Sequence, residues 1–263
     1  MDLCISDKLA LVTGSTAGIG LEIARKLSIE GANVFVTGRD QAKLDAAVAS
    51  IRKSGGAKVS GVLADVATAA GVATLLGRIP QVDILVNNLG IYESKAFDEI
   101  TDDDWMRYFE VNVMSGVRLS RAYFSKMLKK NSGRIIFIAS ESALAIPPDM
   151  IHYGMTKTAQ LSIARGLAGL TKGTGVTVNS VLPGPTRSEG IVDFLKSQAK
   201  DPNAPAAQLE AEFFATARAS SLLQRMIEPE EIANLVAYVA SPLSSATNGA
   251  ALRVEGGLIS TIA

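Results

Sequence analysis

The sequence predicts an α/β protein, a single domain in which a doubly wound, seven-stranded parallel sheet carries helices on both faces. Short β-rich apolar runs alternate with longer stretches of helical apolar spacing, which is the order of strands joined by helical crossovers. Several of these runs are apolar throughout, as expected of strands that are buried on both faces. The chain has 263 residues, of which 48% are apolar and 20% charged, and can bury one large core.

The predicted sheet begins with Leu9–Val12, which is followed by a helical pattern over Ile19–Ile29 and a second strand at Asn33–Val36. The later strands are predicted at Lys58–Leu63, Asp83–Val86, Arg134–Ala139, Val176–Val181 and Ala250–Val254. No repeat, low-complexity tract or linker interrupts this order. We therefore expect residues 1–263 to form one domain.

One segment, between Pro185 and Met226, departs from the alternation. An insertion of this size in a compact domain is usually a lid or a binding loop. We expect a substrate lid at about residues 186–225, with a plain surface excursion as the alternative. In place of a strand the segment holds two short amphipathic patterns, formed by Ile191, Phe194 and Leu195 and by Leu209, Phe213 and Phe214.

The composition excludes several functional classes. The 26 Lys and Arg residues balance 26 Asp and Glu residues, which argues against nucleic-acid binding. Cys4 is the only cysteine, so neither an intramolecular disulfide nor a cysteine-based metal cluster is expected. The N-terminal residues lack a secretion signal, and no apolar run approaches the roughly 18 residues of a membrane span. The expectation is a cytoplasmic protein that needs no metal and no membrane.

A glycine-rich turn with the spacing G-x-x-x-G-x-G follows the first predicted strand and leads into the first helix. Its backbone N–H groups can approach a pyrophosphate closely, and the helix N-terminus adds partial positive charge. A tight turn without a ligand is the alternative, but the place between strand and helix favours a Rossmann-type dinucleotide site. The predicted cradle comprises Gly14, Ser15, Thr16, Gly18, Ile19 and Gly20.

The end of the second strand indicates which dinucleotide binds. An NAD site carries a carboxylate there for the ribose 2′-hydroxyl, whereas the 2′-phosphate of NADP needs a cation. Arg39 can bind a phosphate through two N–H donors, and Gly38 leaves room beside it. NADP is therefore the preferred cofactor. Asp40, or an ordinary surface role for Arg39, keeps NAD as the alternative.

Tyr153 and Lys157 lie four positions apart in a predicted helix and share one face. An ammonium about 4 Å from a phenol favours the phenolate by roughly 4 kcal/mol at an effective dielectric of 20, or about 3 pKa units. The pair therefore predicts a tyrosine able to exchange protons near neutral pH. Taken alone, the same spacing also fits a solvated helix face.

Further motifs follow in order along the chain, at Asp65, Asn87–Gly90, Asn112, Ser140 and Pro183–Thr186. With these motifs, the sequence resembles the classical short-chain dehydrogenase/reductase family over essentially its whole length, and 3-oxoacyl-carrier-protein reductases within it. This resemblance implies that Tyr153 exchanges a proton with the substrate oxygen and that Lys157 lowers the tyrosine pKa. It also implies that Ser140 hydrogen-bonds the substrate oxygen and that Asn112 anchors a water relay between Lys157 and solvent.

The resemblance also implies the remaining cofactor contacts and a homotetramer. In it, helices near residues 104–129 and 152–170 would pack across one two-fold axis and the C-terminal strand across another. Two positions depart from the family, Leu89 for the usual alanine and Glu255 for the usual aspartate, and these change the pocket shape without removing a reacting group. The implied cofactor-binding positions outside the glycine turn are Asp65, Val66, Asn88, Gly90, Tyr153, Lys157, Pro183, Gly184 and Thr186.

Residues expected to face the substrate are mostly apolar, which predicts a ketone or secondary alcohol with a hydrophobic body. Glu141 could instead favour a polar hydroxyl. His152 is turned about 100° from Tyr153 on the helix and is expected at the pocket rim or the surface. The expected substrate-facing residues are Ile91, Tyr92, Glu141, Ser142, Leu144, Ile146, Pro147, Phe194, Phe213 and Leu222.

The predicted function is that of an NADP-dependent oxidoreductase acting on a small carbonyl or alcohol. A 3-oxoacyl-(carrier protein) reductase is the alternative, for which Lys129, Lys130 and Lys172 would form a basic landing patch. A dinucleotide-binding regulator without turnover is the alternative of another class. It is disfavoured because the four reacting positions are all present.

Overall fold

The computed structural model describes residues 1–55, 58–188, 191–199 and 201–262, and in them seven parallel strands form one sheet. The strand order β3-β2-β1-β4-β5-β6-β7 confirms the predicted fold class, and every pairing is parallel. The strands are β1 (Leu9–Val12), β2 (Asn33–Gly38), β3 (Val59–Leu63), β4 (Ile84–Asn87), β5 (Gly133–Ile138), β6 (Val176–Pro183) and β7 (Ala251–Val254).

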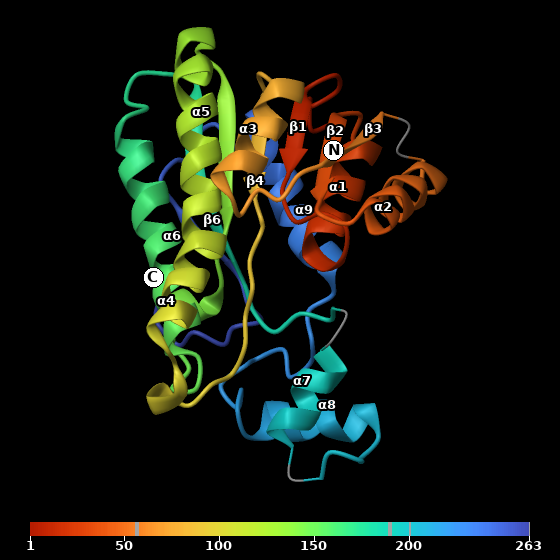
Figure 1. Ribbon diagram of the computed structural model, residues 1–263, viewed down its shortest axis with the longest axis vertical. Helices are drawn as coiled ribbons and strands as arrows, with labels where there is room; N and C mark the ends of the chain where they lie inside the picture. The colour runs from red at the N-terminus through yellow and green to blue at the C-terminus, as the bar shows by residue number, and fades with distance from the viewer. Residues whose placement is uncertain (56–57, 189–190, 200, 263) are drawn as a thin grey trace.

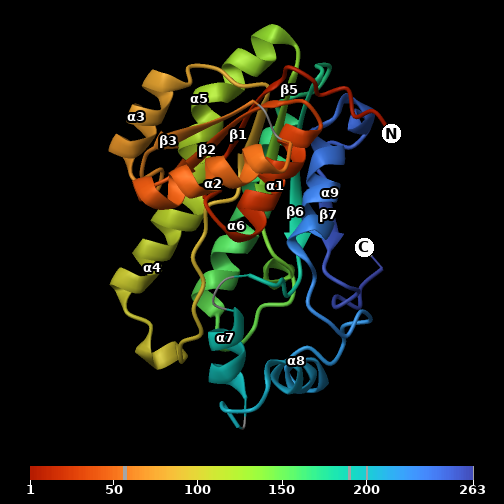
Figure 2. The ribbon, with the colours of Figure 1, turned by 90° about the vertical axis from the view of Figure 1, so that its right-hand side faces the viewer.

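Helices cover both faces of this sheet (Figures 1 and 2). Successive residues of β1 point to opposite faces, so that Ala10 and Val12 join one hydrophobic cluster and Leu11 joins the other. The first cluster includes α1 (Gly18–Ile29), α2 (Gln41–Lys53) and α9 (Pro229–Ala240). The second includes α3 (Ala69–Arg78), α5 (Ser115–Lys130) and α6 (Ile151–Gly169).

The shorter elements connect these layers. A capping box on Thr101 and Asp104 opens α4 (Asp102–Tyr108), and a π-helical turn over Phe109–Met114 joins α4 to α5. The 3₁₀ turns are Phe97–Glu99, Glu141–Ala143 and Pro242–Ser244. Among the described residues, none of the helices has the length and apolar character that a bilayer crossing requires.

The segment expected to be a lid forms α7 (Ile191–Gln198) and α8 (Ala206–Ala215) beyond the carboxyl ends of the strands (Figures 1 and 2). Both amphipathic patterns are helical, and their apolar sides pack together with Met226 in a separate cluster. Residues 189–190 and 200 of the expected lid lie outside the described residues. Whether the segment opens and closes stays a prediction.

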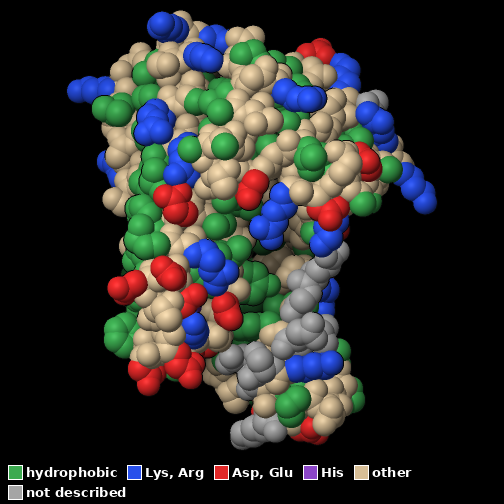
Figure 3. All heavy atoms as spheres, in the orientation of Figure 1, with side chains coloured by type: hydrophobic (Ala, Val, Ile, Leu, Met, Phe, Trp, Pro, Cys, Tyr) green, Lys and Arg blue, Asp and Glu red, His purple; other side chains and the backbone are tan. Residues whose placement is uncertain are grey.

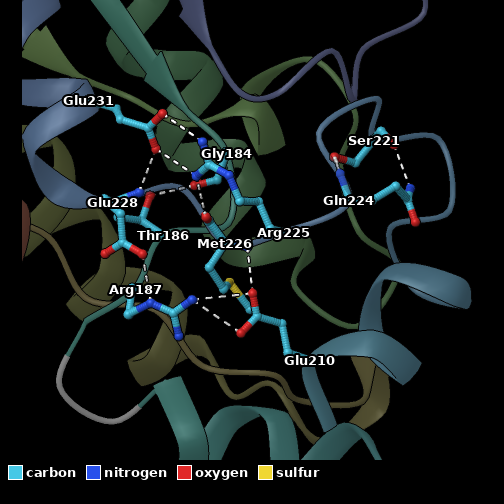
Figure 4. A network of polar contacts seen from close by, with 10 residues as sticks. All are labelled: Gly184, Thr186, Arg187, Glu210, Ser221, Gln224, Arg225, Met226, Glu228 and Glu231. Atoms are coloured by element: carbon cyan, nitrogen blue, oxygen red, sulfur yellow. Dashed lines mark hydrogen bonds and ion pairs between the residues drawn. The ribbon is translucent and has the colours of Figure 1, made fainter. Parts of the chain in front are cut away.

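Polar contacts join the two ends of this segment (Figure 4). Thr186 and Ile227 form a parallel bridge, and the guanidinium of Arg187 reaches Glu228 at 2.9 Å and Glu210 at 3.2 Å. Glu210 also accepts a hydrogen bond from the backbone of Met226 at 2.9 Å. These contacts therefore hold together the two ends of the segment, where it leaves β6 and where it returns to α9.

Candidate active site

A cavity of about 400 Å³ lies between the carboxyl ends of the strands and α7 and α8, where Figure 3 shows the molecule hollowed. In a doubly wound sheet the strand order reverses beside the first strand, and ligands bind outside the strand ends there. Here β1 lies between β2 and β4, so the cavity occupies that position. Predicted residues that line it are Gly14, Gly18, Ile19, Gly20, Asn88, Gly90, Ile91, Tyr92, Ser140, Glu141, Ser142, Tyr153, Lys157, Pro183, Gly184, Thr186, Phe194 and Phe213.

The glycine-rich turn adopts a conformation that only glycine accommodates easily. Gly14 and Gly18 have φ angles of +59° and +54°, in the left-handed region. A Cβ atom on Gly20 would lie 2.4 Å from both Asn88 Nδ2 and the Gly14 carbonyl oxygen. Asn88 donates hydrogen bonds to the carbonyls of Thr13, at 2.9 Å, and Gly14, at 3.0 Å. The turn is thus held against the end of β4 while its backbone faces the cavity.

Two side chains of the predicted cradle support the turn and do not line the cavity. Ser15 donates to the Val12 carbonyl at 2.7 Å and accepts from the Thr37 amide at 3.0 Å. Thr16 packs against Gly38, where a Cβ atom would lie 2.5 Å from its methyl group. The close approach of Thr16 therefore favours glycine at position 38, and the predicted space for a ligand beside it stays a prediction.

At the end of β2, Asp40 and Arg39 have separate roles. The Asp40 carboxylate accepts a hydrogen bond from the Lys43 amide at 2.9 Å and caps α2. Arg39 is exposed and makes neither an ion pair nor a hydrogen bond with any described residue. The structure thus gives Asp40 a capping role and leaves the Arg39 guanidinium available to an anion.

Asp65 and Val66 follow β3 and do not line the cavity. Asp65 is half-buried and accepts from the Ala67 amide at 3.2 Å. Val66 is buried in the second hydrophobic cluster. The structure brings neither residue to the cavity wall, so their predicted adenine contacts stay predictions.

Ser140, Tyr153 and Lys157 meet at the cavity, the first from the end of β5 and the others from α6. The Lys157 ammonium donates to the Ile138 carbonyl at 2.9 Å and lies 5.6 Å from the centre of the Tyr153 ring. A hydrogen bond with Ser140 lowers the Tyr153 pKa, but burial and the charge of Glu141 outweigh it. All three residues therefore line the same cavity.

The prediction that Lys157 lowers the Tyr153 pKa by about 3 units is wrong for the free protein. Burial, followed by the negative charge of Glu141, raises the Tyr153 pKa well above its ordinary value. Burial likewise lowers the Lys157 pKa to about 8, with Glu141 acting in the opposite direction. A single attraction between ammonium and phenolate does not determine this pKa, because desolvation and the charge of Glu141 act in the opposite direction.

Asn112 lies in the π-helical turn and is fully buried beside the cavity. Its side-chain oxygen accepts from the Ile91 amide at 2.8 Å, and its Nδ2 donates to the Ile91 carbonyl and to Thr156 Oγ1, both at 3.0 Å. The carbonyl oxygen of Asn112 accepts from Gln160 Nε2 at 2.6 Å, and Gln160 Oε1 accepts from Lys157 Nζ at 3.3 Å. An amide side chain, rather than a direct contact, therefore joins Lys157 to Asn112.

Sequence reasoning missed Gln160 and Arg218. The signal for Gln160 was its place three residues after Lys157, on the same helix face. Arg218 had no local signal, because it reaches the cavity from the segment after α8. Its guanidinium lies 3.6 Å from the buried Glu141 carboxylate and 5.4 Å from the centre of the Phe213 ring.

Aromatic rings form the apolar wall of the cavity. The Tyr92 ring lies edge-on to Tyr153 at 6.3 Å and to Phe194 at 6.4 Å. Phe194 meets Phe213 in the same way at 6.0 Å. Residues of α7 and α8 thus complete the pocket in which Tyr153 sits, as expected for Phe194 and Phe213.

Several other residues that were expected to shape the substrate pocket do not line this cavity. Ile146 and Pro147 line a second cavity of about 380 Å³ that shares Phe213 and Arg218 with the first. Leu144, at 49% exposure, and Leu222, at 85%, lie outside both cavities. Leu89 packs against the second hydrophobic cluster and does not line the pocket either.

The prediction for His152 is wrong, because this residue is fully buried. The ring packs 4.1 Å from that of Tyr108 and 6.1 Å from that of Trp105, since α4 covers this side of α6. Burial lowers its pKa, and neither ring nitrogen has a hydrogen-bond partner among the described residues. His152 is a neutral packing residue that does not face the cavity.

The lysines of the predicted landing patch lie at the wrong end of the molecule. Lys129 and Lys130 end α5 just before β5, and Lys172 lies between α6 and β6. All three are therefore near the amino ends of the strands, whereas the cavity lies beyond the carboxyl ends. Around α4, Figure 3 instead shows Asp and Glu side chains gathered at the lower left. The predicted patch therefore gives no support to an acidic carrier docking at the pocket.

The chain is similar in sequence and structure to known oxidoreductases. The family model described as short chain dehydrogenase matches residues 8–199. The chain is 48% identical over 263 residues to the uncharacterized oxidoreductase YvaG of Bacillus subtilis (strain 168), with 100% of both chains covered. It is 30% identical over 262 residues to the 3-oxoacyl-(acyl-carrier-protein) reductase FabG of Aquifex aeolicus, covering 98% of this chain and 100% of that one. The L-sorbose reductase of Gluconobacter frateurii, complexed with NADPH and L-sorbose, superposes with a TM-score of 0.91 at 31% identity, with 100% of both chains covered.

Proposed function

Since this chain belongs to the short chain dehydrogenase family, we propose that it is an NADP(H)-dependent oxidoreductase of a small ketone or secondary alcohol. The observation that carries the proposal is the meeting of Ser140, Tyr153 and Lys157 in one cavity beside the glycine-rich turn. A regulator that only binds a dinucleotide would not need these three groups around one space.

The residues present fit the dinucleotide. The backbone of the glycine-rich turn leaves no room for a Cβ atom at Gly20, and its N–H groups lie at the N-terminus of α1, where a pyrophosphate is stabilised. The exposed Arg39 would hold the 2′-phosphate, while Lys157 and Thr186 lie on the cavity wall where the nicotinamide end would sit. The L-sorbose reductase structure contains NADPH, which supports the choice of NADP. When bound, the cofactor supplies or accepts the hydride.

The protein groups would control the proton. Tyr153 keeps its proton at neutral pH and can give it to the carbonyl oxygen as hydride reaches the carbon. Ser140 would hold that oxygen by a hydrogen bond, and the Lys157 ammonium would stabilise the phenolate that remains. The rings of Tyr92, Phe194 and Phe213 would exclude water from the substrate body.

A panel of carbonyl compounds, followed by NADPH absorbance, tests the proposal. Tyr153→Phe is expected to lower kcat by at least about 100-fold, because the proton donor is removed. Its Kd for NADPH should stay within about threefold of the unchanged protein, since the cradle is untouched. Tyr238→Phe, on the exposed side of α9, is the matched control. Full activity of Tyr153→Phe would show that another group moves the proton.

The second candidate is a 3-oxoacyl reductase, favoured by the 30% identity with the Aquifex aeolicus enzyme. Comparing turnover of acyl thioesters with that of simple ketones separates the two. The homotetramer implied by the resemblance also stays a prediction, which sedimentation at micromolar concentration tests.

A further inference from the structure

The pocket holds one charged pair that the proton chemistry above does not require. Glu141 follows Ser140 directly and is buried, with 5% of its surface exposed. Arg218 reaches the same cavity from beyond α8, and 16% of its side chain is exposed. Burying two further charges in a pocket that also has aromatic walls is costly unless their hydrogen-bonding groups are satisfied there.

The pair is incompletely satisfied. The closest nitrogen and oxygen of Arg218 and Glu141 are 3.6 Å apart, too far for a good hydrogen bond. Arg218 Nε is buried and has no hydrogen-bond partner among the described residues. The Glu141 carboxylate accepts a hydrogen bond from the Ser140 hydroxyl. The Ser142 amide donates a hydrogen bond to the same serine oxygen at 3.1 Å.

Ser140 has one hydroxyl proton, so in this arrangement it cannot also donate to a substrate oxygen. A simple ketone would have to compete with Glu141 for the hydrogen bond from Ser140. If it won, the buried carboxylate would lose that hydrogen bond. A ligand that brings a donor of its own to Glu141 frees Ser140 for the carbonyl oxygen. Substrate recognition and the serine hydrogen bond are therefore coupled through Glu141.

A neutral hydroxyl suits this pair because it donates to a carboxylate and accepts from a guanidinium at once. A carboxylate would be attracted to Arg218 but repelled by Glu141, and an ammonium would meet the reverse. Accepting that the protein is a carbonyl reductase, we propose that its substrates carry a hydroxyl on the carbon next to the carbonyl, held between Glu141 and Arg218. The substrate class is thus α-hydroxyketones and, in the reverse direction, vicinal diols.

The chemistry of this class matches the positions of the residues. The two oxygens of an α-hydroxyketone are on neighbouring carbons, as Ser140 and Glu141 are neighbours whose side chains touch. Hydride from NADPH adds to the carbonyl carbon, the Tyr153 proton goes to the carbonyl oxygen, and the products are a vicinal diol and NADP⁺. The second hydroxyl takes no part in bond changes and serves only to position the ketone.

Three ketones of nearly equal size test the proposal: 1-hydroxybutan-2-one, pentan-3-one and 2-oxobutanoate. They share an ethyl ketone and differ only in a hydroxymethyl, ethyl or carboxylate group. With NADPH, the kcat/KM for the hydroxyketone is expected to exceed that for each of the others by about 10- to 100-fold, the value of one hydrogen bond to a charged group. Equal kcat/KM values for hydroxyketone and pentan-3-one would overturn the proposal.

Glu141→Gln keeps the side-chain size and removes the charge. It is expected to lower the preference for hydroxyketone over pentan-3-one by about tenfold. It should also improve 2-oxobutanoate relative to the hydroxyketone, because Arg218 then acts without an opposing charge. Glu99→Gln, at an exposed glutamate away from both cavities, is the matched control and should leave all three ratios as they are. Unchanged ratios in Glu141→Gln would refute the role of this carboxylate.

Equilibrium binding separates failure of this inference from failure of the proposed function. Competition by butane-1,2-diol and by pentan-3-ol for the protein with NADP⁺ can be followed by ligand-observed NMR without turnover. Selective binding of the diol without any hydride transfer would retain the hydroxyl subsite and reject the reductase. Turnover of all three ketones without selectivity would retain the reductase and reject the hydroxyl subsite.

Discussion

The buried ammonium of Lys157 makes the stability of the free protein depend on pH. Its pKa falls from 10.5 to about 8 on folding, chiefly through burial, and 4% of the residue is exposed. At about 1.4 kcal/mol per unit, the charged form costs about 3 kcal/mol at neutral pH. The folded state binds fewer protons than the unfolded chain between the two pKa values, so this cost decreases as pH rises from 8 toward 10.5.

The expected relief between pH 7 and pH 9.5 is about 2 kcal/mol. It is measured as the difference in free energy of unfolding between the unchanged protein and Lys157→Met, by urea titration at each pH. Protein concentration is held constant, because association would add to the apparent stability. The Tyr153 pKa is raised by folding, so its contribution is constant below about pH 10 and lost only above it. A difference that changes by less than about 0.5 kcal/mol over this range would refute the depressed lysine pKa.

Three further outcomes follow from the same contacts. Arg39→Asp should weaken NADPH binding by about 10- to 100-fold relative to NADH, because a charged hydrogen-bond donor becomes a repelling anion; equal losses in isothermal titration would contradict the role of Arg39. Gly20→Ala should abolish measurable NADPH binding, since its Cβ atom would lie 2.4 Å from Asn88 and Gly14. Gly77→Ala is the control, because this position in α3 has open space around it. This variant should bind NADPH normally and be more stable by about 0.5 to 1 kcal/mol. Gln160→Leu should cost about 1 to 3 kcal/mol of stability, because it leaves the Asn112 carbonyl unpaired, and should shift the pH profile of kcat. Gln160→Glu should restore the contact to Lys157. Identical pH profiles in the unchanged protein and both variants would show that Gln160 has a purely structural role.

The fold could be predicted because its determinants are local and repeated. The apolar runs of β1 and β5 are buried on both faces, and this burial gives them their continuous apolar sequences. The glycine turn was equally visible, since positive φ at Gly14 and Gly18 demands that residue type. The shared face of Tyr153 and Lys157 was predictable from the four-residue spacing on a helix, and both residues line the cavity.

The electrostatics could not be predicted in the same way. The Tyr153 pKa depends on the charge of Glu141, and Lys157 Nζ is directed to Ile138 and Gln160; neither contact is visible in the spacing of the sequence. His152 was misplaced because its angle on α6 says nothing of α4, which packs over it. Sequence spacing gives the direction of a side chain within its own element, but burial depends on the elements packed against it.

Glu141 connects the two unexpected properties of the pocket. Its charge helps to hold the proton on Tyr153, and its carboxylate accepts a hydrogen bond from the Ser140 hydroxyl. For the carbonyl reduction proposed above, the free site would thus hold Tyr153 in its acid form but would lack the hydrogen-bond donor of Ser140. A hydroxyl that donates to Glu141 would release Ser140 and leave the tyrosine protonated. The carboxylate would then disfavour simple ketones by withholding one hydrogen bond until a substrate supplies its own.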